Sequence, residues 1–304
     1  MEQFKKSMRH KPVLLKEVLE NLNLKDRNIF LDLTLGSAGH SQAVCKLPLK
    51  DLTIIGIDKD ADAIKRSASY LDNCNAKIIL ENFPNSELDK VLRKNHLEKV
   101  DAVLIDLGIS SEQLDISGRG FTFQKNEPLL MTMKKNITER DLTAKIIVNT
   151  FSEESLADII FGYGEERYAR RIAKQIVEYR KTKEINTTFD LVEIIKESVP
   201  RSYRTKKIHF ATKTFQALRI AVNNEFSDLP ITLNKSFEVL NSKGRLLVIS
   251  FHSIEDRIVK DWMRKKERNK EAKRINKKVI IPNKEEKLSN PRSRSSKLRI
   301  LEKL

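Results

Sequence analysis

The stretch Phe30-Leu-Asp-Leu-Thr-Leu-Gly-Ser-Ala-Gly-His-Ser41 is followed shortly by Thr53-Ile-Ile-Gly-Ile-Asp58. An apolar run, a glycine turn, a short helical segment and a second apolar run ending in an acid predict a β-α-β unit. The turn would present backbone N–H groups and admit a ligand closely at Gly36 and Gly39. Asp58 lies 22 positions after Gly36, where such folds place an acid against ribose hydroxyls.

This turn differs from the dinucleotide fingerprint. That fingerprint reads G-x-G-x-x-G because a pyrophosphate sits on the helix N-terminus, whereas here Gly36-Ser-Ala-Gly39 lacks the third glycine. A cofactor with adenosine and no phosphates, S-adenosylmethionine, therefore fits better than a nicotinamide dinucleotide, which disfavours a dehydrogenase. A simpler interpretation remains open, in which the glycines only shape a tight turn and Asp58 caps the next helix.

Length and composition describe a chain with a substantial core and no sign of export. The 304 residues are 39% hydrophobic, enough for one large domain or two ordinary ones. No apolar run approaches the roughly 18 residues of a membrane span, and the N-terminus has no apolar signal region. Cys45 and Cys74 have no paired-ligand spacing and the five histidines are scattered, so neither a disulfide nor a metal site is expected. We therefore expect a reduced, cytoplasmic protein with no membrane partner.

The charge is strongly basic, with 58 Lys and Arg against 42 Asp and Glu, a formal net charge of +16. Residues 264–304 hold 16 Lys and Arg and 5 Glu, so 16 − 5 gives +11 in this segment. Such a surplus favours a polyanionic partner, which the segment would hold through RNA or DNA phosphates. A solvated basic helix and tail is the competing interpretation.

Alternating apolar runs and helical patterns predict a doubly wound α/β sheet. The expected parallel strands are residues 29–33, 53–58, 77–80, 102–106 and 245–251, with residues 297–302 as a returning edge strand. The expected helices are residues 60–71, 86–95 and 212–226. Residues 112–210 show helical periodicity without a convincing strand, which predicts an inserted helical domain. The expected partition is therefore 1–111, 112–210 and 211–304, the last part including the basic segment.

Three positions are candidates for chemistry, and two of them, Asp106 and His252, lie at the predicted carboxyl edge of the sheet, where open α/β sheets bind ligands. Asp106 ends the fourth predicted strand and could accept a hydrogen bond from an amine to be methylated, or could simply cap the following turn. Arg119 lies between Gly118 and Gly120 and could meet a phosphate or fasten the loop to a carboxylate. His252 follows the fifth strand; its pKa suits proton transfer, although a lone histidine is more often structural.

Several further motifs follow in order along the chain. Together with the opening stretch, they resemble the RsmH (MraW) family from His10 to the C-terminus. The motifs are His10-Lys-Pro-Val-Leu-Leu-Lys-Glu-Val18, Gly56-Ile-Asp-Lys-Asp60, Asp106-Leu-Gly-Ile-Ser-Ser111, Gly164-Glu-Glu-Arg167, Thr214-Phe-Gln-Ala-Leu-Arg-Ile220, Val248-Ile-Ser-Phe-His-Ser253 and Asn290-Pro-Arg-Ser-Arg-Ser295.

The resemblance implies a Rossmann-like S-adenosylmethionine-dependent methyltransferase with an inserted helical domain. Its substrate would be the exocyclic N4 amine of a cytidine in 16S rRNA, in the decoding centre of the small ribosomal subunit. The insertion would recognise the substrate. The implied cofactor contacts are Ala38, Gly39, His40, Asp58, Phe83, Asp106 and Gln113. Asp58 would take the ribose hydroxyls, Phe83 would pack on adenine, and Asp106 would attract the sulfonium and face the target amine.

One segment departs from the family pattern. Family members read Pro-Leu-Asp-Met-Arg-Met-Asp after the Arg-Gly-Phe loop, whereas this chain reads Pro128-Leu-Leu-Met-Thr-Met-Lys134. Leu130, Thr132 and Lys134 thus replace two acids and an arginine, which puts turnover in more doubt than cofactor binding. The alternative hypothesis is a weakly active or non-catalytic rRNA-binding assembly factor that retains the cofactor pocket. The sequence leaves the oligomeric state open, and a homodimer is compatible with it.

Overall fold

The computed structural model describes residues 11–110, 114, 117–134 and 136–304. The chain divides into two compact units, which are Met1–Gly108 with Ser227–Leu304, and Ile109–Phe226. The chain therefore leaves the first unit once and returns to it once. Among the described residues, every helix is too short or too polar to cross a membrane.

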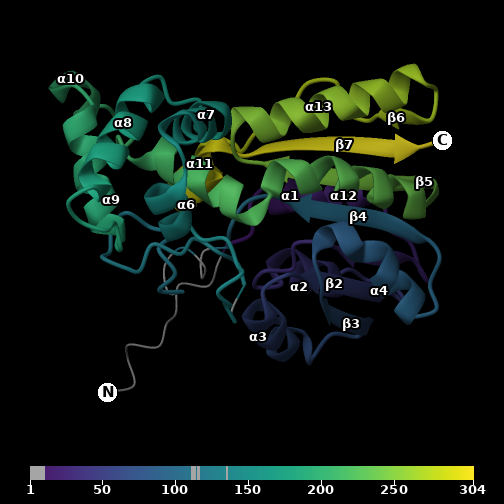
Figure 1. The fold of residues 1–304 in the computed structure, drawn as a ribbon. Helices are drawn as coiled ribbons and strands as arrows, with labels where there is room; N and C mark the ends of the chain where they lie inside the picture. Colours follow the sequence, from purple (N-terminus) through teal and green to yellow (C-terminus); the bar gives the residue numbers. More distant parts are fainter. Residues whose placement is uncertain (1–10, 111–113, 115–116, 135) are drawn as a thin grey trace. The chain divides into compact units, whose positions relative to one another are not determined.

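The first unit is built on a seven-stranded sheet with the order β3-β2-β1-β4-β5-β7-β6 (Figure 1). The strands β1 to β5 pair in parallel, and β7 runs antiparallel to both β5 and β6. Strand order reverses between β1 and β4, which is where such sheets open a ligand crevice at their carboxyl edge. The strands are β1 (Ile29–Asp32), β2 (Thr53–Asp58), β3 (Lys77–Asn82), β4 (Val100–Asp106), β5 (Leu240–Ser250), β6 (Ala272–Arg274) and β7 (Lys297–Lys303).

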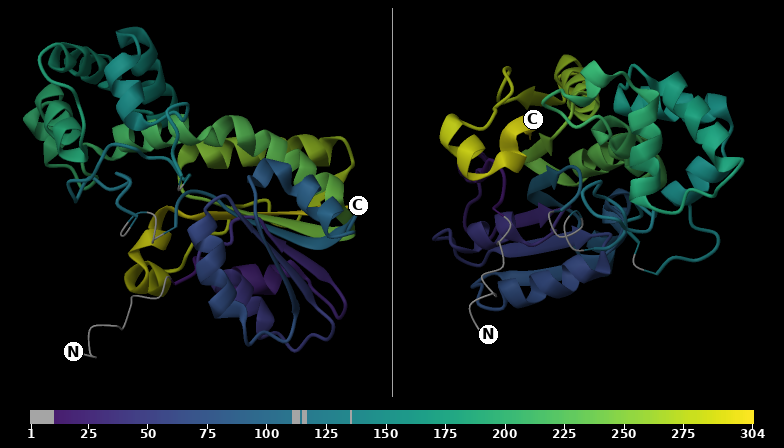
Figure 2. Two further views of the ribbon diagram at one scale, coloured as in Figure 1. Left: turned by 60° about the horizontal axis from the view of Figure 1, so that its bottom comes forward. Right: turned by 90° about the vertical axis from the view of Figure 1, so that its left-hand side faces the viewer.

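Helices cover both faces of this sheet (Figures 1 and 2). On one face, Leu31 and Val103 pack with apolar residues of α4, α12 and α13; on the other, Phe30 and Leu104 pack with residues of α1 and α2. Successive strand residues point to opposite faces, so burial on both sides demands the continuous apolar runs seen in the sequence. The doubly wound α/β class is confirmed. The helices of this unit are α1 (Leu15–Leu22), α2 (Gly39–Cys45), α3 (Ala61–Leu71), η1 (Asn85–Glu87), α4 (Leu88–Lys94), α12 (Glu225–Val239, beginning at the end of the second unit), α13 (Ser253–Arg268), α14 (Lys284–Ser289) and η2 (Pro291–Ser295).

The sequence predicted that the last strand lies at the edge of the sheet, but β7 lies between β5 and β6. Strand β7 pairs with β5 from Arg245↔Glu302 to Ser250↔Lys297, and β6 pairs along its other side. The prediction was wrong because β6 is only three residues long, Ala-Lys-Arg, too short and too polar to show a strand pattern.

The expectation of two unpaired cysteines was also wrong. Cys45 and Cys74 form a disulfide with their Cα atoms 5.4 Å apart. Cys45 ends α2 and Cys74 follows α3, and these helices lie against each other, with Gln42 Nε2 donating to the carbonyl of Tyr70 at 3.0 Å. The pairing depends on this packing, which a spacing of 29 residues cannot reveal.

The second unit is helical among its described residues, apart from one isolated bridge between Pro128 and Thr187. The helical periodicity noted between residues 112 and 210 is seen in α8, where Ile172 and Ile176 are fully buried while Arg170 and Arg171 are exposed. Its core is built from apolar residues of all its longer helices. The helices are α6 (Ala144–Thr150), α7 (Glu153–Gly164), α8 (Ala169–Arg180), α9 (Thr188–Ser198), α10 (Arg201–Arg204) and α11 (Thr212–Asn223).

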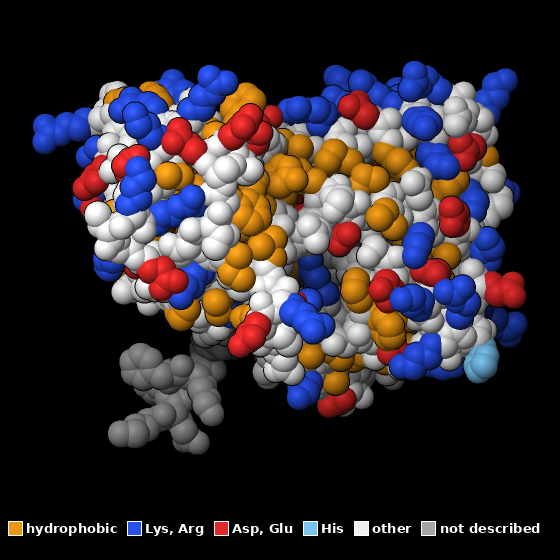
Figure 3. All heavy atoms as spheres, viewed as in Figure 1, with side chains coloured by type: hydrophobic (Ala, Val, Ile, Leu, Met, Phe, Trp, Pro, Cys, Tyr) orange, Lys and Arg blue, Asp and Glu red, His pale blue; other side chains and the backbone are white. Residues whose placement is uncertain are grey.

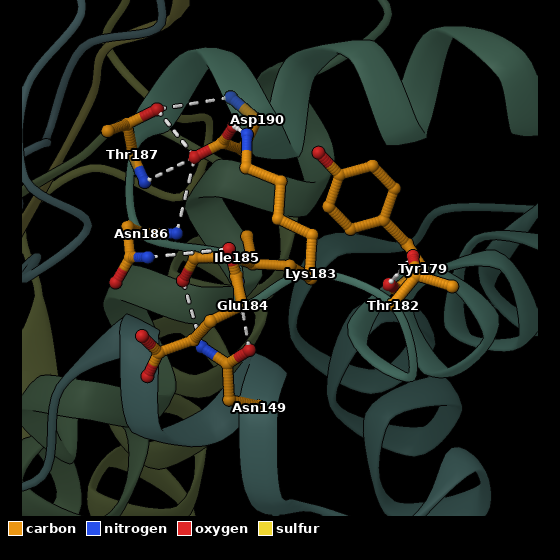
Figure 4. A network of polar contacts seen from close by, with 9 residues as sticks. All are labelled: Asn149, Tyr179, Thr182, Lys183, Glu184, Ile185, Asn186, Thr187 and Asp190. Atoms are coloured by element: carbon orange, nitrogen blue, oxygen red, sulfur yellow. Dashed lines mark hydrogen bonds and ion pairs between the residues drawn. The ribbon is translucent and has the colours of Figure 1, made fainter.

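The connection from α8 to α9 is held by polar contacts (Figure 4). Asn149 of α6 donates to the carbonyl of Ile185 at 2.8 Å and accepts from its N–H at 3.0 Å. Thr187 and Asp190 form a capping box that starts α9, and Lys183 pairs with Asp190 at 3.0 Å. These bonds satisfy backbone groups that the loop would otherwise leave unpaired at the helix start.

Candidate active site

The glycine turn after β1 holds two residues in the left-handed region. Gly36 has φ 52° and Ala38, which precedes α2, has φ 56°. Ala38 pays a steric cost there that glycine would not. At Gly39 the restriction is on side-chain size, because a Cβ there would lie 3.2 Å from the ring of Pro12. The turn is thus fixed by its own backbone and by the segment that precedes α1.

Asp58, at the end of β2, fastens this turn. Its Oδ2 accepts a hydrogen bond from Gly36 N at 2.8 Å and its Oδ1 accepts one from Asp60 N at 2.8 Å. Burial raises the pKa of Asp58 to about 6, although both backbone hydrogen bonds act to lower it. A carboxylate oxygen has two lone-pair sites, so Asp58 retains capacity for a hydroxyl donor. The open interpretation of Asp58 as a helix cap is not favoured, since Asp60 caps α3.

His40, in the first turn of α2, lies close to Asp106 at the end of β4. His40 is 6% exposed, and its Nε2 lies 3.0 Å from the carbonyl of Val13. Burial lowers the pKa of His40 to about 4, so the ring is neutral at pH 7. Thr34 Oγ1 accepts from the backbone N–H of Asp106 at 2.6 Å. Asp106 Oδ1 is buried without a hydrogen-bond partner among the described residues.

Two buried acids, Asp32 and Glu255, lie close enough to Asp106 to influence its charge. Burial raises its pKa well above the usual value, and the charges of Asp32 and Glu255 raise it further. Asp32 accepts from Ser41 Oγ at 2.7 Å and Thr34 N at 3.2 Å, and burial raises its pKa to about 6. Such a cluster favours a cation or an N–H donor beside Asp106. An orphaned buried oxygen within an acidic cluster fits a sulfonium cofactor with an amine substrate.

The remaining predicted residues have different environments. Phe83 follows β3, is partly buried, and has Lys94 Nζ 6.0 Å from its ring centre. Gln113 lies outside the described residues. His252 is the N-cap of α13: its Nδ1 accepts from Glu255 N at 3.4 Å and its Nε2 lies 3.0 Å from Glu255 Oε1. Ala38, Gly39 and His40 belong to the glycine turn and the start of α2, Asp58 is bonded to that turn through Gly36 N, and Asp106 lies beside His40. His252 contacts Glu255, whose charge acts on Asp106.

Sequence reasoning assigned no role to Asp32, Thr34, Ser41 or Glu255. A local signal existed for Glu255, because an acid three residues after an N-cap resembles a capping box; in the structure Glu255 Oε2 accepts from the N–H of Phe251, the residue before the N-cap His252, at 2.9 Å. Asp32 ends β1 as Asp106 ends β4. The position of Asp32 at the carboxyl edge of the sheet could therefore also have been predicted from the sequence.

In the second unit, the side chain of Arg119 binds backbone carbonyl groups of a neighbouring segment. Its Nη1 donates to the carbonyls of Met133 at 2.8 Å and Lys134 at 3.3 Å. Thus Arg119 binds the segment that departs from the family pattern. Within that segment Thr132 is buried and its hydroxyl accepts from Lys134 N at 3.2 Å, while the Lys134 side chain pairs with Asp141.

Comparison with known proteins gives a match over almost the whole chain. Residues 7–304 match the model described as the MraW methylase family. A protein of Acetivibrio thermocellus named ribosomal RNA small subunit methyltransferase H is 46% identical, covering 97% of this chain and 99% of that protein. Proteins with the same name from Thermosipho africanus and Finegoldia magna are 45% and 41% identical, each over 97% of this chain and 98% and 99% of theirs.

Proposed function

This chain belongs to the MraW methylase family, and from that premise we propose that it methylates the exocyclic N4 amine of a cytidine in 16S rRNA. S-adenosylmethionine is the cofactor. The observation that carries the proposal is the identity of 46% over nearly the full length of a ribosomal RNA small subunit methyltransferase. The acidic cluster around Asp106 supports it independently, because it suits a cationic donor beside an amine acceptor.

The cofactor would be held by residues of the turn and of the neighbouring strand ends. Asp58 would accept from the ribose hydroxyls, with Gly36 N–H keeping its carboxylate in place. Phe83 would pack on the adenine and Gln113 would contribute a polar contact. The backbone of Ala38 and Gly39, with His40, would line the remainder. When bound, S-adenosylmethionine supplies an electrophilic methyl group.

Asp106 would act on the acceptor. A cytosine N4 amine is a weak nucleophile because its lone pair is delocalised into the ring. The unpartnered Oδ1 of Asp106 would accept one of its N–H groups, orient the amine and stabilise the positive charge that develops on nitrogen. His40, neutral and fixed by the carbonyl of Val13, would hold the geometry without neutralising the carboxylate. His252 stays a weaker catalytic candidate.

The RNA would contact both units. We assign substrate recognition to the helical insertion, predicted as residues 112–210, and phosphate contacts to the basic segment 264–304. Lys and Arg side chains gather over α13 (Figure 3), where Arg264, Lys265 and Arg268 are exposed. The partner would be the small ribosomal subunit, in the bacterial cytoplasm.

Methyl transfer to small subunits that lack the mark tests this function. The expected result is incorporation of one methyl group, identified as N4-methylcytidine by mass spectrometry of the digested RNA. Calorimetry with S-adenosylmethionine supplies the second readout. Cofactor binding without incorporation into subunits or naked RNA would instead support a non-catalytic assembly factor, the alternative that the altered residues 130–134 raised.

A further inference from the structure

A pocket of about 280 Å³ lies in the first unit, beside the ends of β5 and β7. It is formed by segments far apart in the sequence: the residues after β5, the chain before and within α14, and η2 with the start of β7. The lining includes Phe251, His252, Ile281, Lys287, Arg294 and Lys297. Small-molecule pockets usually exceed about 300 Å³, so this space suits one small group of a larger ligand.

The pocket is positively charged. Lys297 Nζ lies 3.2 Å from Asp256, but that carboxylate is also bound by buried Arg299 at 2.6 and 3.2 Å. Within the part of the chain that the structure describes, Lys287 and Arg294 form no ion pair with an acid. Two carboxylates, Asp256 and the Glu255 group beside His252, therefore face the cations Lys287, Arg294 and Lys297, and the balance still favours an anion in the pocket.

The start of α13 adds to this charge. His252 and Ser253, which line the pocket, are the N-cap and the first residue of a 16-residue helix. The N-terminal end of such a helix carries partial positive charge, which Glu255 and Asp256 in its first turn partly offset. The contacts of His252 with Glu255 hold the ring in one orientation at the pocket wall.

The pocket also adjoins the site where the methyl group would be accepted. Phe251 Cδ2 would lie 3.7 Å from a Cβ on Gly108, two residues after Asp106. The backbone N–H of Leu107 donates to the carbonyl of Ile249 at 2.9 Å, so these chain segments run side by side. Glu255, which holds His252, is one of the two acids that raise the pKa of Asp106.

We propose that this pocket binds a backbone phosphate of the RNA next to the target cytidine. The proposal rests on the function proposed above and adds a positioning site to it. Lys287, Arg294 and Lys297 contact the phosphate, and Phe251 and Ile281 contact the adjoining sugar or base. A base must be splayed out of its stack to reach an enclosed site, and a fixed neighbouring phosphate holds it in that conformation.

The test compares Lys287→Ala/Arg294→Ala with a matched control, Lys25→Ala/Lys50→Ala. The control removes two exposed cations just before β1 and β2, at the opposite edge of the sheet. For the pocket variant we expect affinity for a target-sequence RNA to fall about tenfold, and the slope of log K against log salt to decrease by about 1. KM should rise by a similar factor with kcat changed less than about twofold. The control should match wild type.

A second measurement locates the phosphate. A series of RNAs is prepared, each with a single uncharged methylphosphonate linkage, and the position of that linkage around the target cytidine differs from one RNA to the next. Wild type should lose about tenfold affinity at one linkage adjacent to that cytidine, and the pocket variant should lose none there. Equal losses for both proteins at every linkage would overturn the proposal, as would wild-type affinity and salt slope in the pocket variant.

Two controls distinguish loss of the phosphate contact from misfolding of the variant and from failure of the proposed function. Thermal unfolding and S-adenosylmethionine affinity of each variant verify the fold, and Lys287→Gln/Arg294→Gln replaces any alanine variant that is unstable. The binding measurements do not require turnover. If wild type transfers no methyl group, the function proposed above fails, whereas the linkage experiment still decides whether the pocket holds an RNA phosphate.

Discussion

The Nδ1 atom of His40 lies 3.9 Å from Oδ2 of Asp106. This pair is not an ion pair at neutral pH, because burial lowers the pKa of His40 to about 4. With Nε2 directed to the carbonyl of Val13, the Nε2–H tautomer is favoured and the Nδ1 lone pair faces the carboxyl group. His40 therefore donates no hydrogen bond to Asp106, and the Oδ1 atom of Asp106, buried without a partner among the described residues, is left for a cationic or N–H-bearing ligand to satisfy.

Replacing Asp106 should separate chemistry from folding. We expect Asp106→Asn to reduce kcat on the order of a hundredfold or more, since the electrostatic term aimed at the amine is lost. The fold should remain and cofactor binding should weaken less than turnover. Single-turnover methyl transfer and calorimetry measure the two effects. Asp72→Asn, an exposed residue after α3, is the control; a wild-type rate in Asp106→Asn would remove Asp106 from the reaction.

Replacing Asp58 should act on cofactor binding first. Asp58→Ala removes the proposed ribose acceptor and leaves Gly36 N without its 2.8 Å partner. Hydrogen bonds to a charged group contribute about 1.5–3 kcal/mol, so we expect the cofactor Kd to rise roughly ten- to a hundredfold. Asp58→Asn, which keeps one acceptor oxygen, should show a smaller change. Equal Kd values for wild type and Asp58→Ala in calorimetry would contradict the assignment.

Asp32 should give stability a measurable pH dependence. Its folded pKa of about 6 exceeds the ordinary 3.8, so the folded chain holds this proton more tightly than the unfolded chain. That stabilisation is complete below pH 3.8 and is lost as pH rises through 6. Relative to wild type, Asp32→Asn should therefore gain about 2 kcal/mol in free energy of unfolding between pH 4 and 7. Urea titrations of both proteins measure it, and a difference that stays constant with pH would refute it.

Two glycines of the Arg119 loop provide a matched pair. Both have positive φ, 66° at Gly118 and 75° at Gly120. A Cβ on Gly118 meets nothing within 4 Å, whereas one on Gly120 would lie 2.4 Å from the carbonyl oxygen of Pro128. We expect Gly118→Ala to cost about 1 kcal/mol, from the left-handed backbone alone, and Gly120→Ala to cost clearly more. Unfolding titrations compare them; equal costs would show that the loop moves aside freely.

The disulfide should contribute to stability under oxidising conditions. It closes a loop between positions separated by 29 residues, and loop-closure estimates give about 3–4 kcal/mol for such a loop. We expect Cys74→Ser to be less stable than wild type by that order without reductant, and the difference to shrink after dithiothreitol treatment. A thiol titration that finds two free sulfhydryls in untreated wild type would contradict the pairing.

The sequence predicted those features that depend on local periodicity. The runs ending at Asp58 and Asp106 became β2 and β4 because strands buried on both faces need continuous apolar residues. The end of α9 at Ser198 has a local cause of the same kind, because the residue before a proline such as Pro200 avoids helical backbone.

What the sequence could not predict depends on contacts between distant segments. The Cys45–Cys74 bond requires the packing of α2 on α3, and the place of β7 within the sheet requires the three-residue β6. The acidic cluster is a similar case, since the influence of Glu255 on Asp106 joins residues nearly 150 positions apart. Single-sequence patterns register neighbours along the chain and carry no signal for such pairs.

The position of β7 between β5 and β6 has a consequence for synthesis on the ribosome. Residues 297–303 are translated after every other strand, so β5 keeps one unpaired edge while the nascent chain grows. An exposed edge is a template for pairing with other chains, and the antiparallel partner that closes it is synthesised only after α13, β6, α14 and η2. Until β7 is made, this edge of β5 is the part of the sheet most open to pairing with another chain.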